Sequence, residues 1–301
     1  MVVEKEKCTG CYACVNICPK NCIHMEEDEN GAIYPVIDKT KCVECNLCKK
    51  ICPSINKVKT YYPKECFAMY GKNSELIKKS TSGGIATILA KNIIKKDGVV
   101  YGASFENNEK GLVQTIRIDN EKEIEKLQGS KYVHSYINKT YSMAKEDLEN
   151  KKLVLFIGTP CQIAGLKSFL RKEYDNLYTV DLICHGVPPQ RYLKDEIKDL
   201  TDENIDGISF RSKEGFILKL YKDSKIVKQI SKEESIYYYG FLESLFYREN
   251  CYQCLYAKPE RCSDITIGDF WGLDKEAEIY KSKKEGISVV LPISEKGSNL
   301  L

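Results

Sequence analysis

A cysteine motif occurs twice near the start of the chain, each time as C-x2-C-x2-C-x3-C followed by proline. In this spacing three cysteines hold one 4Fe-4S cluster, and the fourth points away and ligates a second cluster. The motifs therefore predict one cluster held by Cys8, Cys11, Cys14 and Cys52, and a second held by Cys42, Cys45, Cys48 and Cys18. We expect the crossed fourth ligands to fix the two halves of this segment together and the chain to transfer single electrons.

The residues around the motifs are typical of a small ferredoxin-like domain. Apolar segments at 23–25 and 32–37 flank an acidic turn that ends at Gly31, which predicts two short strands of a hairpin. Because so short a domain has little hydrophobic core, the clusters are expected to hold it together. A polar, tyrosine-rich stretch at 57–64 predicts a linker, so we assign this domain to residues 1–58.

Other uses of these cysteines fit the spacing less well. Structural zinc also binds C-x2-C pairs, but it takes four ligands per ion from separated pairs. A disulfide framework is disfavoured because no signal peptide precedes the first motif. Radical chemistry with S-adenosylmethionine is disfavoured because the sequence contains no C-x3-C-x2-C run.

The composition excludes some broad classes of protein. With 301 residues and 43% hydrophobic content, the chain is long enough for a ferredoxin-like domain and a larger globular unit. The 46 Lys+Arg and 43 Asp+Glu residues are nearly balanced and intermixed, so nucleic acid is not an expected partner. No apolar run reaches the roughly 18 residues that a membrane span needs. We expect a cytoplasmic protein, in a reducing interior that keeps its 15 cysteines reduced or metal-bound.

The remaining residues, 65–301, alternate strand-like and helix-like segments. A helical pattern at 85–94 lies between strand-like runs at 66–70 and 99–105. Later in the chain, a predicted helix at 162–172 separates two further strand-like runs, at 153–157 and 177–183. The order strand, helix, strand implies a crossover connection and parallel pairing of these two strands.

Shorter runs beyond residue 200 predict an antiparallel meander, at 208–210, 216–220 and 225–227, with a turn at Asp223 and Ser224. The predicted fold class is therefore α+β. It comprises the small ferredoxin-like domain and a mixed α/β domain with a parallel strand-helix-strand core and an antiparallel meander.

Two glycine-rich turns of the larger domain are candidate binding sites. Ser80-Thr81-Ser82-Gly83-Gly84 precedes the helix at 85–94, where hydroxyl groups could cap the helix and a phosphate could bind the amides. An ordinary capped helix packed on a sheet explains the same residues. Gly129-Ser130-Lys131-Tyr132 offers a hydroxyl and an ammonium group to an anion, although a plain surface turn explains it as well.

The other cysteines predict a third metal centre. Cys161 follows one predicted parallel strand and Cys184 the next, so both are expected at the carboxyl edge of the sheet. Far downstream, three more cysteines form a C-x2-C-x7-C run. We predict a third 4Fe-4S cluster held by Cys161, Cys251, Cys254 and Cys262, with Cys184 as the alternative to Cys161.

Two alternatives stay open for these later cysteines. Zinc could bind the same four thiols. Cys161 could instead be a nucleophile, activated by a helix N-terminus and by His185. Cys22 and Cys66 are interpreted as small hydrophobic side chains.

Six short blocks of the larger domain, in matching order, resemble the beta subunit of coenzyme F420 (deazaflavin) hydrogenases and dehydrogenases. The blocks are Thr81-Ser82-Gly83-Gly84, Gly129-Ser130-Lys131-Tyr132, Gly158-Thr159-Pro160-Cys161-Gln162, Cys184-His185-Gly186-Val187-Pro188, Phe210-Arg211, and Cys251-x2-Cys254 leading to Asp264-Ile265-Thr266-Ile267-Gly268-Asp269-Phe270-Trp271-Gly272. Members with two ferredoxin clusters in front also occur in that family, which agrees with residues 1–58.

The resemblance implies an iron-sulfur flavoprotein oxidoreductase. In it, FAD exchanges electrons with 4Fe-4S clusters and hydride with a deazaflavin or another redox partner. The flavin contacts it implies are Ser82, Gly83 and Gly84, with Ser130, Lys131 and Tyr132 nearby. It assigns no catalytic residue, and His185 and Lys131 are only candidates for a proton donor.

The alternative function is an electron-relay subunit of a larger oxidoreductase, which would bind clusters but no flavin. The chain ends soon after a strand predicted at 286–291, where relatives continue. A C-terminal segment of the flavin-binding domain, assigned to residues 65–301, could therefore be missing.

Overall fold

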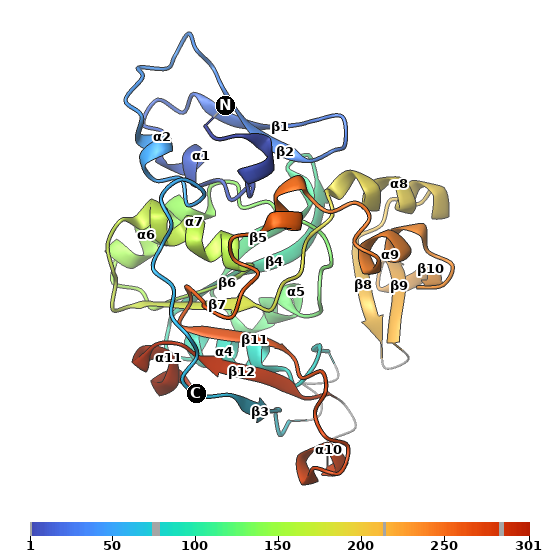
Figure 1. The fold of residues 1–301 in the computed structure, drawn as a ribbon. Helices are drawn as coiled ribbons and strands as arrows, with labels where there is room; N and C mark the ends of the chain where they lie inside the picture. Colours follow the sequence, from blue (N-terminus) through green and yellow to red (C-terminus); the bar gives the residue numbers. More distant parts are fainter. Residues whose placement is uncertain (1, 74–78, 213–214, 283–285) are drawn as a thin grey trace.

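The computed structural model describes residues 2–73, 79–212, 215–282 and 286–301 (Figure 1). A ferredoxin-type domain at the amino-terminal end contains η1 (Lys5–Lys7), α1 (Ala13–Ile17) and α2 (Leu47–Lys50). Its strands β1 (Ile23–Glu27) and β2 (Ile33–Ile37) pair antiparallel. The turn between them contains Gly31 at φ 72°, a conformation that glycine adopts without strain. The predicted hairpin is confirmed.

A mixed seven-stranded sheet forms the centre of the larger domain, in the order β3-β12-β11-β7-β6-β4-β5. Four neighbouring strands are parallel: β4 (Val99–Asn108), β6 (Val154–Gly158), β7 (Leu177–Leu182) and β11 (Ile265–Asp269). Antiparallel strands complete both sides: β5 (Gly111–Ile118), β12 (Ser288–Pro292) and β3 (Phe67–Met69). The predicted parallel unit is confirmed as β6, α7 (Pro160–Leu170) and β7.

Helices cover both faces of this main sheet, because alternate side chains of a strand point to opposite faces. Tyr101 and Phe156 pack with α6 (Thr140–Glu149) and α7 on one face. Val100 and Leu155 pack with α4 (Ile85–Ile94) on the other face, and α4 has the predicted bounds. The smaller helical elements are η2 (Glu121–Glu123), α5 (Ile124–Leu127), α10 (Glu278–Ser282) and α11 (Glu295–Leu300).

The ferredoxin-type domain packs on the side of the main sheet that carries α6 and α7 (Figure 1). Its side chains Tyr12 and Ile51 belong to the same hydrophobic cluster as Phe156 of β6. Gly165 of α7 faces Cys11, and a Cβ at this position would lie 3.0 Å from the Cys11 Sγ. The domain therefore buries its apolar side chains mainly in a core that it shares with the larger domain.

The predicted meander is a separate antiparallel sheet of β8 (Gly207–Ser212), β9 (Gly215–Lys222) and β10 (Lys225–Ser231). Asp223 and Ser224 form its turn with positive φ, as expected. The helices α8 (Gln190–Leu200) and α9 (Ile236–Leu242) pack with it, and η3 (Glu249–Gln253) follows.

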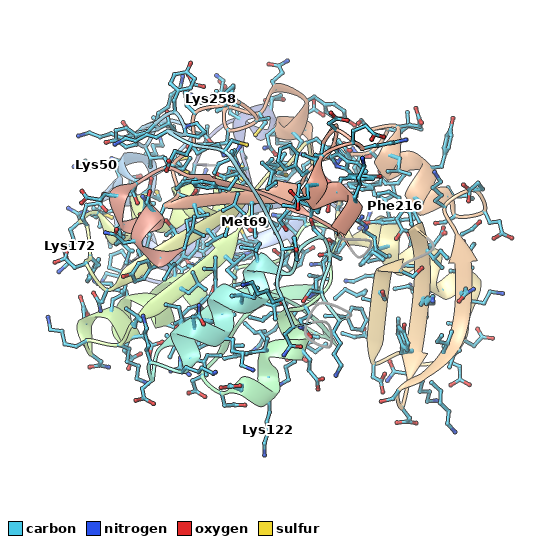
Figure 2. The ribbon with its side chains drawn as sticks, turned by 90° about the horizontal axis from the view of Figure 1, so that it is seen from below. Lys50, Met69, Lys122, Lys172, Phe216 and Lys258 are labelled. Carbon is cyan, nitrogen blue, oxygen red and sulfur yellow. The ribbon has the colours of Figure 1, made fainter. Side chains whose placement is uncertain are left out.

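Figure 2 shows the meander standing beside the main sheet, with Phe216 on the side that faces the rest of the protein. Within the described ranges, no helix is both long and apolar enough to cross a bilayer.

Candidate functional site

One group of thiols lies at the inner end of the ferredoxin-type domain, where Cys8, Cys11, Cys14 and Cys52 line a small cavity of about 20 Å³. Cys14 is half-buried and the other three are buried. Burial raises the pKa of Cys11 to about 12, and the nearby thiols of Cys8 and Cys52 add to that rise. Cys52 of the second motif thus lies with the first three cysteines of the first motif. We call this set the inner thiol group.

A second set, the outer thiol group, lines an open cavity of about 820 Å³ and consists of Cys18, Cys42, Cys45 and Cys48. Cys45 is exposed to solvent. Burial raises the pKa of Cys48, with smaller contributions from Cys45 and Cys18. Cys22 lies beside this group, with its Sγ 3.3 Å from the Cys18 Sγ, so it is a sulfur neighbour as well as a buried side chain.

Both groups fit 4Fe-4S clusters by the chemistry and number of their donors. In the ranges that the structure describes, no three His, Cys, Asp or Glu side chains converge closely enough to hold one metal ion together. A cluster does not require that convergence, because it offers a different iron to each thiolate. Iron ligation itself stays a prediction.

Four thiols from distant segments form a third group beside the main sheet. Cys161 lies in the first turn of α7, Cys184 follows β7, and Cys251 and Cys254 lie in and just after η3. Burial raises the pKa of Cys161, and Cys254, Cys184 and Cys251 also act on this thiol. Burial likewise raises the pKa of Cys184 to about 12, again with Cys251 and Cys254 as neighbours. We call these four residues the third thiol group.

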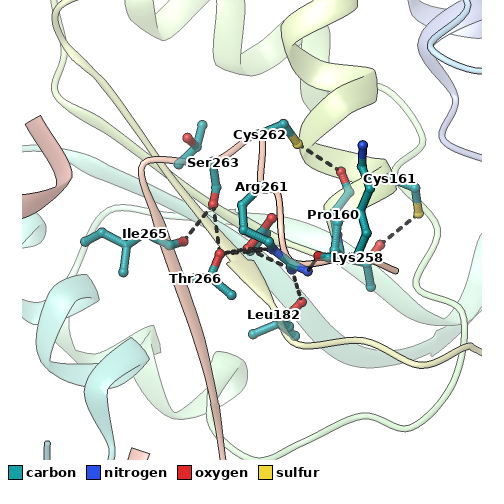
Figure 3. A network of polar contacts seen from close by, with 12 residues as sticks. Pro160, Cys161, Leu182, Lys258, Arg261, Cys262, Ser263, Ile265 and Thr266 are labelled. Carbon is teal, nitrogen blue, oxygen red and sulfur yellow. Dashed lines mark hydrogen bonds and ion pairs between the residues drawn. The ribbon is translucent and has the colours of Figure 1, made fainter. Parts of the chain in front are cut away.

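Cys262, which the sequence placed in this group, lies near Cys161, since both thiols act on Tyr141 and Tyr256, but its Sγ has a different partner. Its Sγ lies 3.5 Å from the carbonyl oxygen of Pro160 (Figure 3). The Cys161 Sγ instead lies 3.2 Å from the Thr159 hydroxyl. Burial raises the pKa of Cys262 to about 12, and the charges acting on it are those of Asp181, Lys167 and Arg261.

A cavity of about 270 Å³ opens at the carboxyl edge of the main sheet, next to the third thiol group. Both glycine-rich turns contribute to its wall, which includes Thr81, Ser82, Gly84, Ser130, Lys131, Tyr132, Cys184 and His185. Gly83 is not among the lining residues, and its amide donates to the Ser288 hydroxyl. The volume is close to the lower end of the range typical of small-molecule pockets.

The start of α4 differs from the expectation in one detail. Its N-cap is Gly84 at φ 75°, and no side chain caps the helix. Ser82 is not a cap, because its hydroxyl donates to the carbonyl oxygen of Ile287 on the way to β12. The expectation of a hydroxyl cap is wrong, because the Ser82 hydroxyl connects this turn to the segment before β12 instead.

Charged groups lie in the wall of this cavity. Burial lowers the pKa of Lys131 to about 7, and its ammonium group donates to the carbonyl oxygens of Gln128 and Lys126. Arg211 of β8 pairs with Asp269 of β11, with Nη1 2.6 Å from Oδ2. This ion pair joins the meander to the cavity wall, because Asp269 also lines the cavity.

His185 is held by a hydrogen bond that defines its tautomer. The Tyr247 hydroxyl lies 2.6 Å from the Phe241 carbonyl oxygen and donates its one hydrogen there. The same hydroxyl oxygen lies 2.7 Å from His185 Nδ1, so Nδ1 carries a hydrogen and donates it. Because burial lowers the pKa of His185, the ring is neutral near pH 7 and leaves Nε2 as an acceptor.

Comparisons with known proteins assign the larger domain. Residues 151–301 match the family described as the C terminus of the coenzyme F420 hydrogenase/dehydrogenase beta subunit. The chain belongs to this family. Residues 7–56 match the 4Fe-4S dicluster domain. The beta-subunit resemblance and the ferredoxin-type domain in front of it are both confirmed.

Similarity to individual proteins is more limited. A xenon-derivatised structure of the F420-reducing [NiFe] hydrogenase complex from Methanosarcina barkeri shares the fold with a TM-score of 0.52. It is 18% identical and covers 80% of this chain and 78% of its own. An uncharacterised ferredoxin of Methanocaldococcus jannaschii is 44% identical over 34 residues, which is 11% of this chain and 44% of that ferredoxin.

The structure also places two residues near the thiol groups that the sequence did not predict there. Arg248 and His134 are buried where the ferredoxin-type domain meets the larger domain. The only sequence signal was the position of Arg248, three residues before Cys251. A single arginine beside a cysteine run is too common to predict a buried charge.

Proposed function

We propose that this protein is an iron-sulfur flavoprotein oxidoreductase. In this proposal it passes electrons between 4Fe-4S clusters and a flavin, and on to a deazaflavin or another redox partner. The observation that carries the proposal is the order of the thiol groups. The exposed Cys45 belongs to the outer group, and Cys11 of the inner group contacts α7 at Gly165. Cys161 lies in the first turn of the same helix, and Cys184 lines the cavity. Thiols thus lead from the surface to a small-molecule site.

For the third cluster we propose the ligands Cys161, Cys184, Cys251 and Cys254. The electrostatic influence of these thiols on one another supports this set. The contact of the Cys262 Sγ with the Pro160 carbonyl oxygen argues for a structural role for Cys262. The proposed set keeps three of the ligands expected from the sequence and takes Cys184 in place of Cys262.

In this proposal the flavin occupies the cavity beside Cys184. A bound flavin accepts two electrons as hydride and releases them singly, which joins hydride chemistry to one-electron carriers. Ser82, Ser130 and Tyr132 would orient it by hydrogen bonds. The N-terminus of α4 at Gly84 would attract its anionic part, because the amides there carry partial positive charge. Lys131 and His185 would hold or release protons at the wall.

Anaerobic purification followed by iron, sulfide and flavin analysis tests the proposal. We expect about twelve irons and one flavin per chain, as three 4Fe-4S clusters and one FAD require. If the iron-loaded protein contains no flavin and does not bind FAD on titration, the flavoprotein function is rejected. The alternative function, an electron-relay subunit, would then remain. Protein that stays colourless after iron and sulfide are supplied would reject both functions.

A further inference from the structure

Arg248 occupies an unusual position between the ferredoxin-type domain and the larger domain. It lies in the loop between α9 and η3 and is 1% exposed, which makes it the largest fully buried side chain of the described residues. Its Nη2 donates to the carbonyl oxygens of Cys8, at 3.2 Å, and Ile33, at 3.0 Å. Its guanidinium carbon lies 5.2 Å from the centre of the Tyr34 ring.

No carboxylate balances this buried charge among the residues that the structure describes. The Arg248 Nε and Nη1 atoms are buried there without a hydrogen-bond partner. Arg261, the other deeply buried arginine, has Asp181 3.0 Å away as its counter-ion. An unpaired charge inside a protein is strongly unfavourable, because burial removes it from water. A negative charge other than a carboxylate near Arg248 would stabilise the buried guanidinium.

Tyr12, Tyr34 and Tyr136 also lie near Arg248, but burial raises the pKa of each and keeps it neutral. The remaining neighbours that can carry negative charge are cysteines. Arg248 reaches the inner thiol group directly, because its Nη2 atom donates to the Cys8 carbonyl oxygen. Along the chain, Arg248 lies three residues before Cys251 of the third thiol group. The backbone links Arg248 to the same cysteine, since the Cys251 amide donates to the Arg248 carbonyl oxygen at 2.8 Å. Arg248 thus lies between the inner thiol group and the third thiol group.

Among the residues that the structure describes, no buried lysine or arginine lines the cavity of the outer thiol group. Lys20, Lys39 and Lys49 line that cavity and are exposed to solvent, where their charges are screened. Lys5 is half-buried there, but Asp28 is its counter-ion at 3.4 Å. A buried guanidinium acts more strongly, because the effective dielectric around it is lower.

We propose that Arg248 is a fixed counter-charge that makes the inner and third centres easier to reduce than the outer centre. The proposal rests on the iron-sulfur function proposed above. A cluster held by four thiolates is anionic and gains one more negative charge on reduction, so a nearby cation stabilises the reduced form. Arg248 thereby favours movement of one electron from the exposed outer centre to the inner one, with no bond made or broken and no proton required.

The test is an EPR-monitored redox titration of the full-length, iron-loaded protein, which reports reduction potentials independently of activity. Arg248→Met removes the charge and keeps an apolar stem of similar length, whereas Arg248→Lys keeps the charge. Arg191→Gln is the matched control. Arg191 also binds the ferredoxin-type domain, through Glu27 and the Glu29 carbonyl oxygen, but its side chain is 41% exposed.

We expect Arg248→Met to weaken electron binding at the inner or third centre at least tenfold, a fall of about 59 mV for a one-electron couple. The outer centre should keep its potential and serves as an internal reference. Arg248→Lys and Arg191→Gln should stay close to wild type.

Unchanged potentials in an Arg248→Met protein with full iron content would overturn the proposal. If Arg248→Met loses iron, Arg248→Lys decides the question: a fall in its potentials despite the retained charge rejects electrostatic tuning. A wild-type protein without reducible iron would instead reject the iron-sulfur function itself.

Discussion

The ferredoxin-type domain takes its eight motif cysteines from one continuous stretch between Cys8 and Cys52, whereas the third thiol group takes its members from two strand ends and a distant loop. Local turns are enough to form the first arrangement. The second exists only once β6 and β7 have paired in parallel and η3 has folded back beside them. Residue spacing alone can therefore predict a site formed by one continuous segment. A site formed by distant segments can be predicted only when the fold is known.

Removal of iron should give the largest difference between the two regions, seen as a difference in amide hydrogen exchange. Without metal, the inner thiols enclose an empty centre, so the amides of β1 and β2 are expected to exchange hydrogen at least about tenfold faster. The amides of β6 and β7 should stay protected, because their sheet is held by its own apolar core. Hydrogen exchange followed by mass spectrometry, on iron-loaded protein and on protein treated with a chelator, measures the protection of both pairs of strands. Unchanged protection of β1 and β2 would mean that the shared core alone holds the domain.

Serine substitutions in the third thiol group give the next largest effect. Cys184→Ser should lose about four irons per chain, since a cluster of four irons would lose a ligand. Cys262→Ser introduces the same change at a thiol that contacts the Pro160 carbonyl oxygen, and it should keep full iron content. Iron analysis of both variants distinguishes the two ligand sets. The opposite outcome would restore the set expected from the sequence.

Periodicity and spacing predicted much of the fold. The helix of α4, the parallel pair β6 and β7, and the meander are local patterns that the structure confirms. Both glycine-rich turns were candidates from sequence, and both line the same cavity. Their meeting could not be predicted, because it depends on the strand order.

Three further features could not be predicted from sequence, because they also depend on contacts between distant segments. The proximity of Cys184 to Cys251 and Cys254 requires η3 to return to the carboxyl edge of β7. The burial of Arg248 and the core shared by two domains both arise from packing between segments far apart in sequence. No periodic pattern records such contacts.

The junction between the two regions can be tested at Gly165. In Gly165→Ala the new Cβ would lie 2.9 Å from both the Cys11 Cβ and the Tyr141 hydroxyl oxygen. We expect a loss of about 1–3 kcal/mol in the free energy of unfolding, despite the better helix propensity of alanine. Anaerobic denaturant titration measures it. Gly102→Ala is the control, because its nearest neighbour is the flexible Leu127 side chain at 3.2 Å. An equal cost in both variants would argue against a tight junction.

The smallest effect is expected at the helix cap beside the third thiol group. Thr159 and Gln162 form a capping box at the start of α7. Thr159→Ala removes the hydroxyl and should reduce the free energy of unfolding by about 1 kcal/mol. Thr159→Ser retains the hydroxyl and should stay near wild type. Thermal or denaturant unfolding compares them, and equal stability of all three proteins would contradict the role of the cap.

The apolar cluster that joins Tyr12 and Ile51 to Phe156 has a consequence for how electrons reach this protein. A ferredoxin domain on a free tether can swing between donor and acceptor, as a mobile carrier does. Here the domain is packed against α7, so swinging would expose buried side chains to water. In the electron path proposed above, a redox partner would approach the exposed end at Cys45, and electron delivery would depend on contact with that partner.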